Sequence, residues 1–154
     1  MGITLTNTVN LLQDLHAAIP GVEWSPHLDD YPRGELARSD LPCILTIPGP
    51  GTMNNRFGIG CRSEEREYQI MVMVADTGSS VQTEFFPEVA RLIDELHELY
   101  NGNSVGNASN SDLHVEVSGE NAPDDTGIDD EVSHADTRYY GFQLTVRIWR
   151  KAST

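Results

Sequence analysis

The sequence predicts an α+β fold, a two-layer domain in which two helices pack on one face of a mixed, mostly antiparallel sheet. Three observations lead to this prediction. Two segments repeat apolar residues at helical spacing, shorter segments alternate apolar and polar residues, and the elements follow one another as helix, three strands, helix and two strands. A chain of 154 residues has the size of a single domain, residues 1–154, and can bury a substantial core.

The first helix is expected over Thr4 to Ala18. Its apolar residues recur at three- and four-residue steps and form one stripe: Leu5, Val9, Leu12, Leu15 and Ile19. Thr4 or Thr6 can cap its start, because a hydroxyl oxygen accepts a hydrogen bond from a free N–H of the first turn. Pro20-Gly21 ends the helix, and a short strand over Gly21 to Ser25 can follow before a polar loop.

Two strands of a hairpin are expected next. Leu41 to Ile47 contains several residues that favour strands, and Pro48 to Gly51 has the composition of a turn. Asn54 to Cys61 is then expected to return as the hairpin partner. In that pairing Cys43 and Cys61 would lie near each other as reduced thiols.

A polar turn, Arg62 to Arg66, leads to the clearest strand of the first half, Glu67 to Ala75. Both faces of this strand are mostly apolar, which is typical of a central strand. After a turn, Gln82 to Tyr100 is predicted as the second helix, with Pro87 in its first turn. Its stripe comprises Phe86, Val89, Ile93, Leu96 and Tyr100.

The last part of the chain is predicted to hold two strands separated by an acidic loop. Leu113 to Ser118 alternates as a half-buried strand does, Gly119 to Asp136 is expected to be loop, and Arg138 to Arg150 alternates over its whole length. The core between sheet and helices is expected to contain Val72, Val74, Leu92, Leu96, Leu144 and Val146.

The charge of the chain is strongly negative, with 10 Lys and Arg against 24 Asp and Glu, a net charge of −14. Twelve of these carboxylates lie between Leu92 and Thr137, where there is no Lys or Arg. Such a surface argues against sequence-specific DNA binding, which depends on basic residues that neutralise phosphates. Nine of the ten cations are Arg, and acid excess with scarce Lys fits a halophilic host, although a GC-rich genome would also favour Arg.

Motifs for catalysis or ligand binding are sparse. The five His residues show no metal-ligand spacing, the acidic segment from Asp124 to Asp129 lacks the alternation of a calcium loop, and Gly49-Pro50-Gly51 does not open a helix. No apolar run approaches the length of a membrane helix. We therefore expect no enzyme, no cofactor, no bound metal and no membrane contact.

Several local segments follow one another in a recognisable succession. They are Leu11-Leu12-Gln13-Asp14-Leu15 before Ile19-Pro20-Gly21-Val22, then Asp40-Leu41-Pro42-Cys43-Ile44-Leu45, Arg66-Glu67-Tyr68-Gln69-Ile70-Met71-Val72, the Phe86–Tyr100 helix, and Tyr139-Tyr140-Gly141-Phe142-Gln143-Leu144-Thr145-Val146. This succession, from Thr4 to Trp149, resembles the tail terminator (tail completion) proteins of long-tailed phages and related archaeal viruses.

The resemblance implies a structural virion protein in the tail or neck, assembled in the host cytoplasm. Copies of the chain would form a homo-oligomeric ring, usually a hexamer, that caps the tail tube and ends its elongation. Its partners would be the tail-tube protein and the head connector or neck protein, and genome DNA would pass through without specific binding. The acidic loop Gly119 to Asp136 is longer than the family leads us to expect.

Assembly residues are predicted on loops and sheet edges, including the hairpin tip Pro48 to Asn55. We expect five carboxylates to line the lumen or an interface, since carboxylates repel phosphates: Asp124, Asp125, Asp129, Asp130 and Glu131. Four cations are candidate partners for a neighbour's carboxylates, because Arg forms forked pairs: Arg33, Arg38, Arg56 and Arg62. The alternative interpretation makes these residues a solvated loop and solubilising charges.

Two other functions remain open at this point. One is another neck or head–tail joining protein of similar size. The other, from a different class, is a small cytosolic α+β enzyme or ligand-binding domain.

Overall fold

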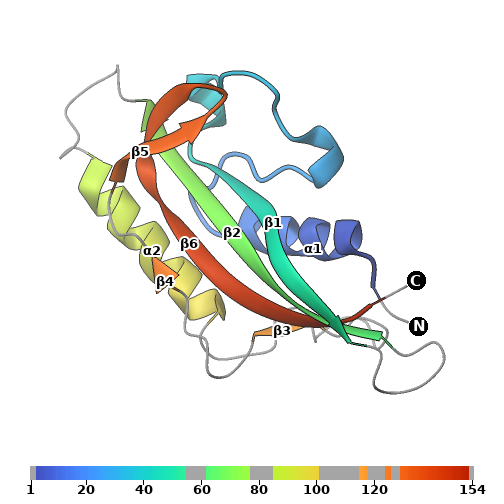
Figure 1. Cartoon of the computed structure of the whole chain (residues 1–154). Helices are drawn as coiled ribbons and strands as arrows, with labels where there is room; N and C mark the ends of the chain where they lie inside the picture. Colours follow the sequence, from blue (N-terminus) through green and yellow to red (C-terminus); the bar gives the residue numbers. More distant parts are fainter. Residues whose placement is uncertain are drawn as a thin grey trace.

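The computed structural model describes residues 3–54, 62–76, 85–100, 115–117, 124–125 and 129–152. In these ranges the elements are helix α1 (Leu5–Ala17), two short 3₁₀ turns (Leu28–Asp30 and Arg38–Asp40), strands β1 (Cys43–Asn54) and β2 (Arg62–Asp76), helix α2 (Phe86–Tyr100), and strands β3 (Val115–Val117), β4 (Asp124–Asp125), β5 (Asp129–His134) and β6 (Thr137–Ala152). The strands form one sheet in the order β1-β2-β6-β3, and β4 and β5 also pair with β6. All of these pairings are antiparallel (Figure 1).

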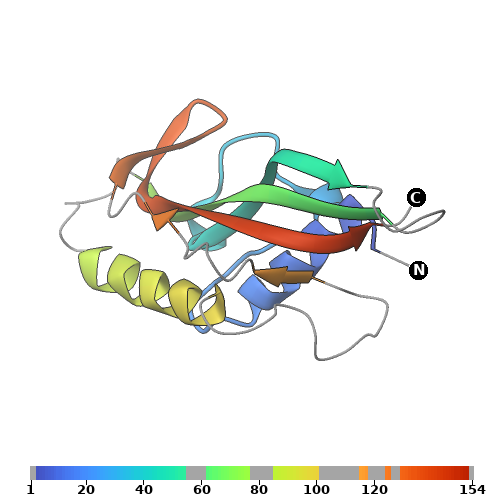
Figure 2. The same cartoon turned by 60° about the horizontal axis from the view of Figure 1, so that its bottom comes forward.

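The two helices lie on the same face of the sheet, as Figure 2 shows from the side. Alternate residues of β1, β2 and β6 point toward them and are buried together with the apolar stripes of both helices: Val9, Leu12, Ile44, Ile70, Val72, Leu92, Leu96, Phe142, Leu144, Val146 and Ile148 among others. Every one of the six predicted core residues is buried. The predicted two-layer α+β fold is therefore confirmed.

Both helix predictions are confirmed within the described residues. Thr4 caps α1, because its Oγ1 accepts a hydrogen bond of 3.1 Å from the backbone N–H of Asn7. Helix α2 begins at Phe86 with Pro87 in its first turn and ends at Tyr100. Residues 82–84 of the predicted second helix lie outside the described residues. The predicted strand Gly21 to Ser25 is reduced to a single parallel bridge between Trp24 and Cys43.

The predicted first hairpin is wrong in its register and its turn. Strand β1 continues through Pro48 to Gly51, which forms an irregularity in the β1–β2 ladder and not a turn. Its partner is β2, which already includes Arg62 to Arg66, the segment predicted as a polar turn. Cys43 lies opposite Met73, and Cys61 is outside the described residues. Strand β2 is central, as predicted, between β1 and β6.

The acidic loop prediction is also wrong in part, because Asp124–Asp125 and Asp129–His134 pair with β6. A two-residue turn, Ala135 and Asp136, joins β5 to β6, and both residues have positive φ (49° and 63°). Mirror-image turns of this kind match the twist of a hairpin but normally favour Asn or Gly. The Ala-Asp pair gave no such signal in the sequence.

The β5–β6 hairpin curls over the face of the sheet opposite to the helices (Figures 1 and 2). There it packs with residues from the loop before β1 and forms a second, smaller core, whose buried members are Leu36, Cys43, Leu45, Met73, Val132 and Tyr139. Burial raises the pKa of the Cys43 thiol to about 12, so this cysteine is a packed, protonated residue.

Gly141 makes this close packing possible. The register of the β2–β6 ladder shifts between Met73 and Ala75, next to the position where Gly141 faces β2. A Cβ atom at residue 141 would lie 1.8 Å from the carbonyl oxygen of Val72. Only glycine fits where the two backbones approach this closely.

A buried polar network fastens α1 to the sheet. Gln13 on α1 donates from Nε2 to the backbone carbonyls of Pro26 and Ile44, each at 2.8 Å. Its Oε1 accepts a hydrogen bond of 2.8 Å from the hydroxyl of Thr46 on β1. Because Gln13 is completely buried, these bonds offset the cost of removing its amide from water.

The same network extends to α2 through His16. Oε1 of Gln13 can only accept, so the 3.1 Å contact makes Nδ1 of His16 the donor. Nε2 of His16 then accepts a 2.6 Å hydrogen bond from the Tyr100 hydroxyl. His16 is therefore held neutral, and complete burial lowers its pKa from 6.5 to about 3.

We predict that Leu96→Ala destabilises the protein by about 2–5 kcal/mol, through lost contacts and the cavity that it leaves. Leu96 is fully buried, whereas Asp94 on the same helix is exposed. Chemical denaturation measures the change, with Asp94→Ala as the control. Equal unfolding midpoints for Leu96→Ala and the wild type would show that the helix does not pack as described.

We predict that acid destabilises the fold through His16. The unfolded chain takes up a proton at this residue below pH 6.5, whereas the folded chain resists it down to about pH 3. The contribution of His16 to the free energy of unfolding is therefore fully present above pH 6.5. It falls by about 1.4 kcal/mol per pH unit as the pH drops from 6.5 toward 3. Unfolding measured between pH 8 and pH 4 should show a flatter slope for His16→Gln than for the exposed control His27→Gln. Identical slopes would contradict the neutral, buried state.

Candidate assembly surfaces

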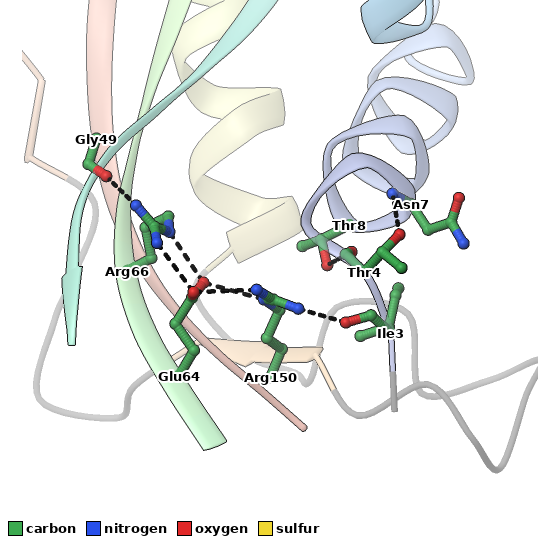
Figure 3. Close-up of polar contacts among 8 residues, drawn as sticks. All are labelled: Ile3, Thr4, Asn7, Thr8, Gly49, Glu64, Arg66 and Arg150. Atoms are coloured by element: carbon green, nitrogen blue, oxygen red, sulfur yellow. Dashed lines mark hydrogen bonds and ion pairs between the residues drawn. The ribbon is translucent and has the colours of Figure 1, made fainter. Parts of the chain in front are cut away.

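A buried ionic cluster of Glu64, Arg66 and Arg150 lies at the end of the sheet where α1 begins (Figure 3). Oε1 of Glu64 accepts from Nε of Arg66 at 2.9 Å and from Nε of Arg150 at 3.0 Å. Oε2 accepts from the Nη2 atoms of the same two residues at 2.9 and 3.0 Å. One carboxylate is thus held by two forked guanidinium groups, and we call this cluster the Glu64 clamp.

The Glu64 clamp joins four parts of the chain. Nη1 of Arg66 donates to the carbonyl oxygen of Gly49 in β1 at 2.7 Å, and Nη1 of Arg150 donates to the carbonyl oxygen of Ile3, just before α1. Glu64 and Arg66 belong to β2 and Arg150 belongs to β6. The clamp therefore ties β1, β2, the last strand and the start of the first helix together.

The charged groups of the clamp are largely shielded from water, so they interact strongly. The side chains of Glu64 and Arg150 are only 2% and 5% exposed. Burial alone would raise the pKa of Glu64, but the hydrogen bonds from Arg66 and Arg150 outweigh it and lower the pKa to about 2. The carboxylate therefore stays ionised in the folded protein, and its stabilising effect is lost only as the pH falls from about 4.5 toward 2.

The Pro-Gly-Pro-Gly segment of β1 makes room for the clamp. A Cβ atom at residue 51 would lie 2.9–3.0 Å from three atoms of the Arg66 side chain, and one at residue 49 would lie 3.2 Å from the Glu67 carbonyl oxygen. Glycine at these positions lets the Arg66 side chain cross β1 and reach the Gly49 carbonyl. The glycines indicated a turn in the sequence, but their role is close packing.

Among the residues that the structure describes, the face of the sheet opposite to the helices is partly exposed over the half next to the clamp. Its residues are polar or partly exposed: Ile47, Glu65, Glu67, Gln69, Gln143, Thr145, Arg147 and Trp149. Arg147 pairs with Glu67 across the β2–β6 ladder at 3.0 Å, and a shallow pocket of about 380 Å³ lies between this pair and the Pro50–Thr52 segment.

The outer edge of β1 is protected along its first half. The N–H of Ile44 donates to the carbonyl of Trp24 at 3.0 Å. The Tyr31 hydroxyl accepts from the N–H of Thr46 at 3.0 Å and donates to its carbonyl at 2.7 Å. Both groups of Thr46 are satisfied, and the Pro48 that follows has no N–H, so this part of the edge resists pairing with another strand.

The structure places the predicted Arg residues in different settings. Arg33 is exposed in the loop between the two 3₁₀ turns, and Arg38 forms a 2.9 Å ion pair with Asp76 of its own subunit. Arg62 begins β2 opposite Ala152, and Arg56 lies outside the described residues. Arg38 therefore already has a carboxylate partner, which weakens its predicted role in pairing with a neighbour.

The predicted acidic residues are brought to one edge of the sheet. Asp124 and Asp125 in β4 lie opposite Thr145 and Leu144 of β6, and Asp129 in β5 lies opposite Gly141. Asp130 and Glu131 follow in β5. The strands β4 and β5 and the strand β1 therefore lie on opposite sides of the β2–β6 pair in the same sheet.

Sequence reasoning missed the Glu64 clamp. The segment Arg-Ser-Glu-Glu-Arg-Glu from Arg62 to Glu67 has the composition of a solvated turn. The available signal was the two-residue spacing of Glu64 and Arg66, which puts both side chains on one face if the segment is a strand.

The His, Cys, Asp and Glu side chains of the described ranges were also compared for metal-binding geometry. There, no three His, Cys, Asp or Glu side chains gather closely enough to hold a metal ion. No helix found in these ranges has the length and apolar character to cross a membrane.

We predict that Glu64→Gln destabilises the protein by about 3–5 kcal/mol, because it leaves two buried or half-buried guanidinium groups without their counter-charge. Glu65, the exposed neighbour in β2, provides the matched control Glu65→Gln, for which we expect little change. Urea unfolding of both variants measures the difference. Equal stability of the two variants would contradict the role of the clamp.

No family model matches this chain, and no curated protein matches it. The resemblance to tail terminators stays a prediction, and the function is inferred from the residues and their geometry.

Proposed function

We propose that the chain is a structural virion protein of the tail terminator type. Copies of it form a ring on the end of a viral tail tube, stop the elongation of the tube and join the tail to the head connector. The subunit works through protein contacts and carries out no reaction.

The observation that carries the proposal is where the segments of the resemblance lie in the folded chain. They fall in α1, at the start of β1, in β2, in α2 and in β6, all of which pack around one core. A small α+β subunit with this element order is what the resemblance implies for a tail terminator.

The distribution of surfaces supports assembly by unlike contacts. The helices cover one face of the sheet, the other face is open near the clamp, and the two edges differ in sequence and charge. A subunit whose opposite sides differ can contact its neighbours head to tail, and such contacts close into a ring when the rotation permits.

The charge distribution supports a conduit for DNA. Arg66, Arg91, Arg147 and Arg150 are engaged by carboxylates of their own subunit, and the whole sequence has a net charge of −14. A passage lined by such subunits repels phosphates, so DNA can slide through it without adhering.

We predict that inactivating the gene in the viral genome that encodes it yields separated heads and tails, or tails of uncontrolled length, in electron micrographs. Supplying the wild-type chain from a plasmid should restore complete virions. Normal, infectious virions in the absence of the protein would overturn the proposed function.

A second set of variants tests the five predicted acidic residues of β4 and β5, which we call the acidic edge. The combined change Asp124→Asn, Asp125→Asn, Asp129→Asn, Asp130→Asn and Glu131→Gln removes five charges without deleting the residues of β4 and β5. The matched control removes five charges from exposed carboxylates elsewhere: Glu23, Asp29, Asp30, Glu35 and Asp94. If the acidic edge lines the passage or an interface, the first set should reduce the yield of infectious virions and the control should not.

A further inference from the structure

A small groove lies between the C-terminal ends of α1 and α2, on the solvent side of the helix layer. Its volume is about 300 Å³, at the small end of pockets that enclose a ligand, so it accommodates one or two side chains. The apolar part of its described lining comes from the ends of both helices: Leu15, Ala18, Ile19, Pro20 and Leu99. Ala18 and Pro20 are exposed, so a neighbouring molecule can reach the groove.

The α2 side of this groove is negative. Glu95 and Glu98 line it, and neither carboxylate forms an ion pair within the described part of the subunit, since the arginine of α2, Arg91, pairs with Glu88 at 2.6 Å. The carbonyl ends of both helices add negative potential. The groove therefore fits a side chain with an apolar stem and a positive tip, as arginine and lysine have.

The exposed Arg33 is the matching group within the same chain. It has no hydrogen bond or ion pair in the described part of the subunit. The other arginines whose side chains the structure describes already have partners. Carboxylates of the same subunit hold five of them, and Arg138 also has an interaction partner: the five are Arg38, Arg66, Arg91, Arg147 and Arg150.

The loop that carries Arg33 is held on both sides and projects between its anchors. The Tyr31 hydroxyl is hydrogen-bonded to the backbone of β1, and the N–H of Leu36 donates to the Tyr139 hydroxyl at 2.9 Å. A Cβ atom at Gly34 would meet no atom within 4 Å, so the tip stands clear of the rest of the subunit. A side chain presented in this way loses little freedom of the backbone when it binds.

Arg33 and the groove lie on different sides of the subunit. Leu36 is buried in the second core, on the face of the sheet opposite to the helices, whereas the groove is on the solvent side of the helices. In Figure 2 the helices lie on one side of the sheet and the loop before β1 rises on the other. The backbone of Arg33 is two residues from Tyr31, so it stays within about 7 Å of this anchor at the edge of β1. Arg33 therefore meets such a groove on another copy of the chain.

We propose that Arg33 of one subunit inserts into the groove between α1 and α2 of the next, with its apolar stem on Leu15 and Leu99 and its guanidinium group at Glu95 and Glu98. The occupant is a second copy of this chain. The contact is heterologous, because loop and groove lie on different parts of the subunit, and its repetition builds a ring or a filament. The inference rests on the self-association that the proposed function requires, but not on the virion role.

A charge-swap experiment on the full-length protein tests the contact, with sedimentation equilibrium from low to molar salt as the measurement. Arg33→Glu and Glu98→Arg should each raise the dissociation constant between subunits by about tenfold or more at low salt. The combined variant restores an opposite-charge pair and should recover to within about threefold of the wild type. The controls are Arg38→Glu, an exposed arginine already paired with Asp76, and Asp94→Arg, an exposed α2 carboxylate outside the groove lining. Each control should change the dissociation constant by less than about threefold.

The direction of the two single effects separates a specific contact from general repulsion between copies. Arg33→Glu makes the net charge of −14 more negative, whereas Glu98→Arg makes it less negative. General repulsion would weaken the association of the first variant and strengthen that of the second. The docking contact weakens both. Because both side chains are exposed, the unfolding midpoints of the two variants should equal that of the wild type.

A disulfide cross-link locates the contact independently in a Cys61→Ser background. Gly34→Cys, next to Arg33, combined with Ala18→Cys in the groove should give disulfide-linked copies on oxidation. Gly34→Cys combined with Ala90→Cys, an exposed position of α2 outside the groove lining, should not.

Unchanged association of both single variants, without cross-linking, would overturn the inference and leave the proposed virion role standing. Weaker association of Glu98→Arg but not of Arg33→Glu would mean that the groove receives another occupant, which contradicts the inference. A wild-type protein that stays monomeric at every concentration and salt would contradict it as well, whereas normal virions without the protein would overturn the proposed function alone.

Discussion

The carboxylate of Glu64 is the point on which one whole end of the structure depends. It holds the guanidinium groups of Arg66 and Arg150, and these groups reach the carbonyls of Gly49 and Ile3. A strand bulge, two central strands and the start of the first helix are therefore fixed by one buried anion. Buried ion pairs of this kind are costly to desolvate, so they stabilise only when their geometry and remaining hydrogen bonds are well satisfied. The clamp satisfies both oxygens of the carboxylate twice, which explains why Glu64 tolerates almost complete burial.

The clamp and the polar network of Gln13 and His16 fix different parts of α1. The clamp fixes the start of the helix, and the network fixes its middle to β1 and to Tyr100 of α2. The apolar face of the sheet is then closed by both helices, while among the described residues the opposite face is covered where the β5–β6 hairpin and the loop before β1 pack on it. In the described residues, one face of the sheet is therefore closed by helices, and the opposite face is partly exposed beside the clamp.

Much of the fold could be predicted from the sequence, because helical stripes and two-residue alternation report directly on burial. The long strand from Thr137 and the central position of β2 followed from such patterns. The sequence predictions failed where one residue type occurs in two kinds of local structure. Gly49 and Gly51 provide space for Arg66 and do not form a turn. The β5–β6 turn uses Ala135 and Asp136 in place of Asn and Gly. The pairing of β4 and β5 with β6 had no recognisable signal in these acidic segments.

We propose that this acidic subunit closes into a ring through unlike surfaces. The most direct measurement is the native mass of the purified wild-type protein in concentrated salt, where repulsion between copies is screened, together with electron micrographs of the same sample. The account predicts ring-shaped particles of one discrete mass, about six times 17.0 kDa if the ring is the hexamer that the resemblance implies. A monomer under all conditions, or open filaments of indefinite length, would contradict it.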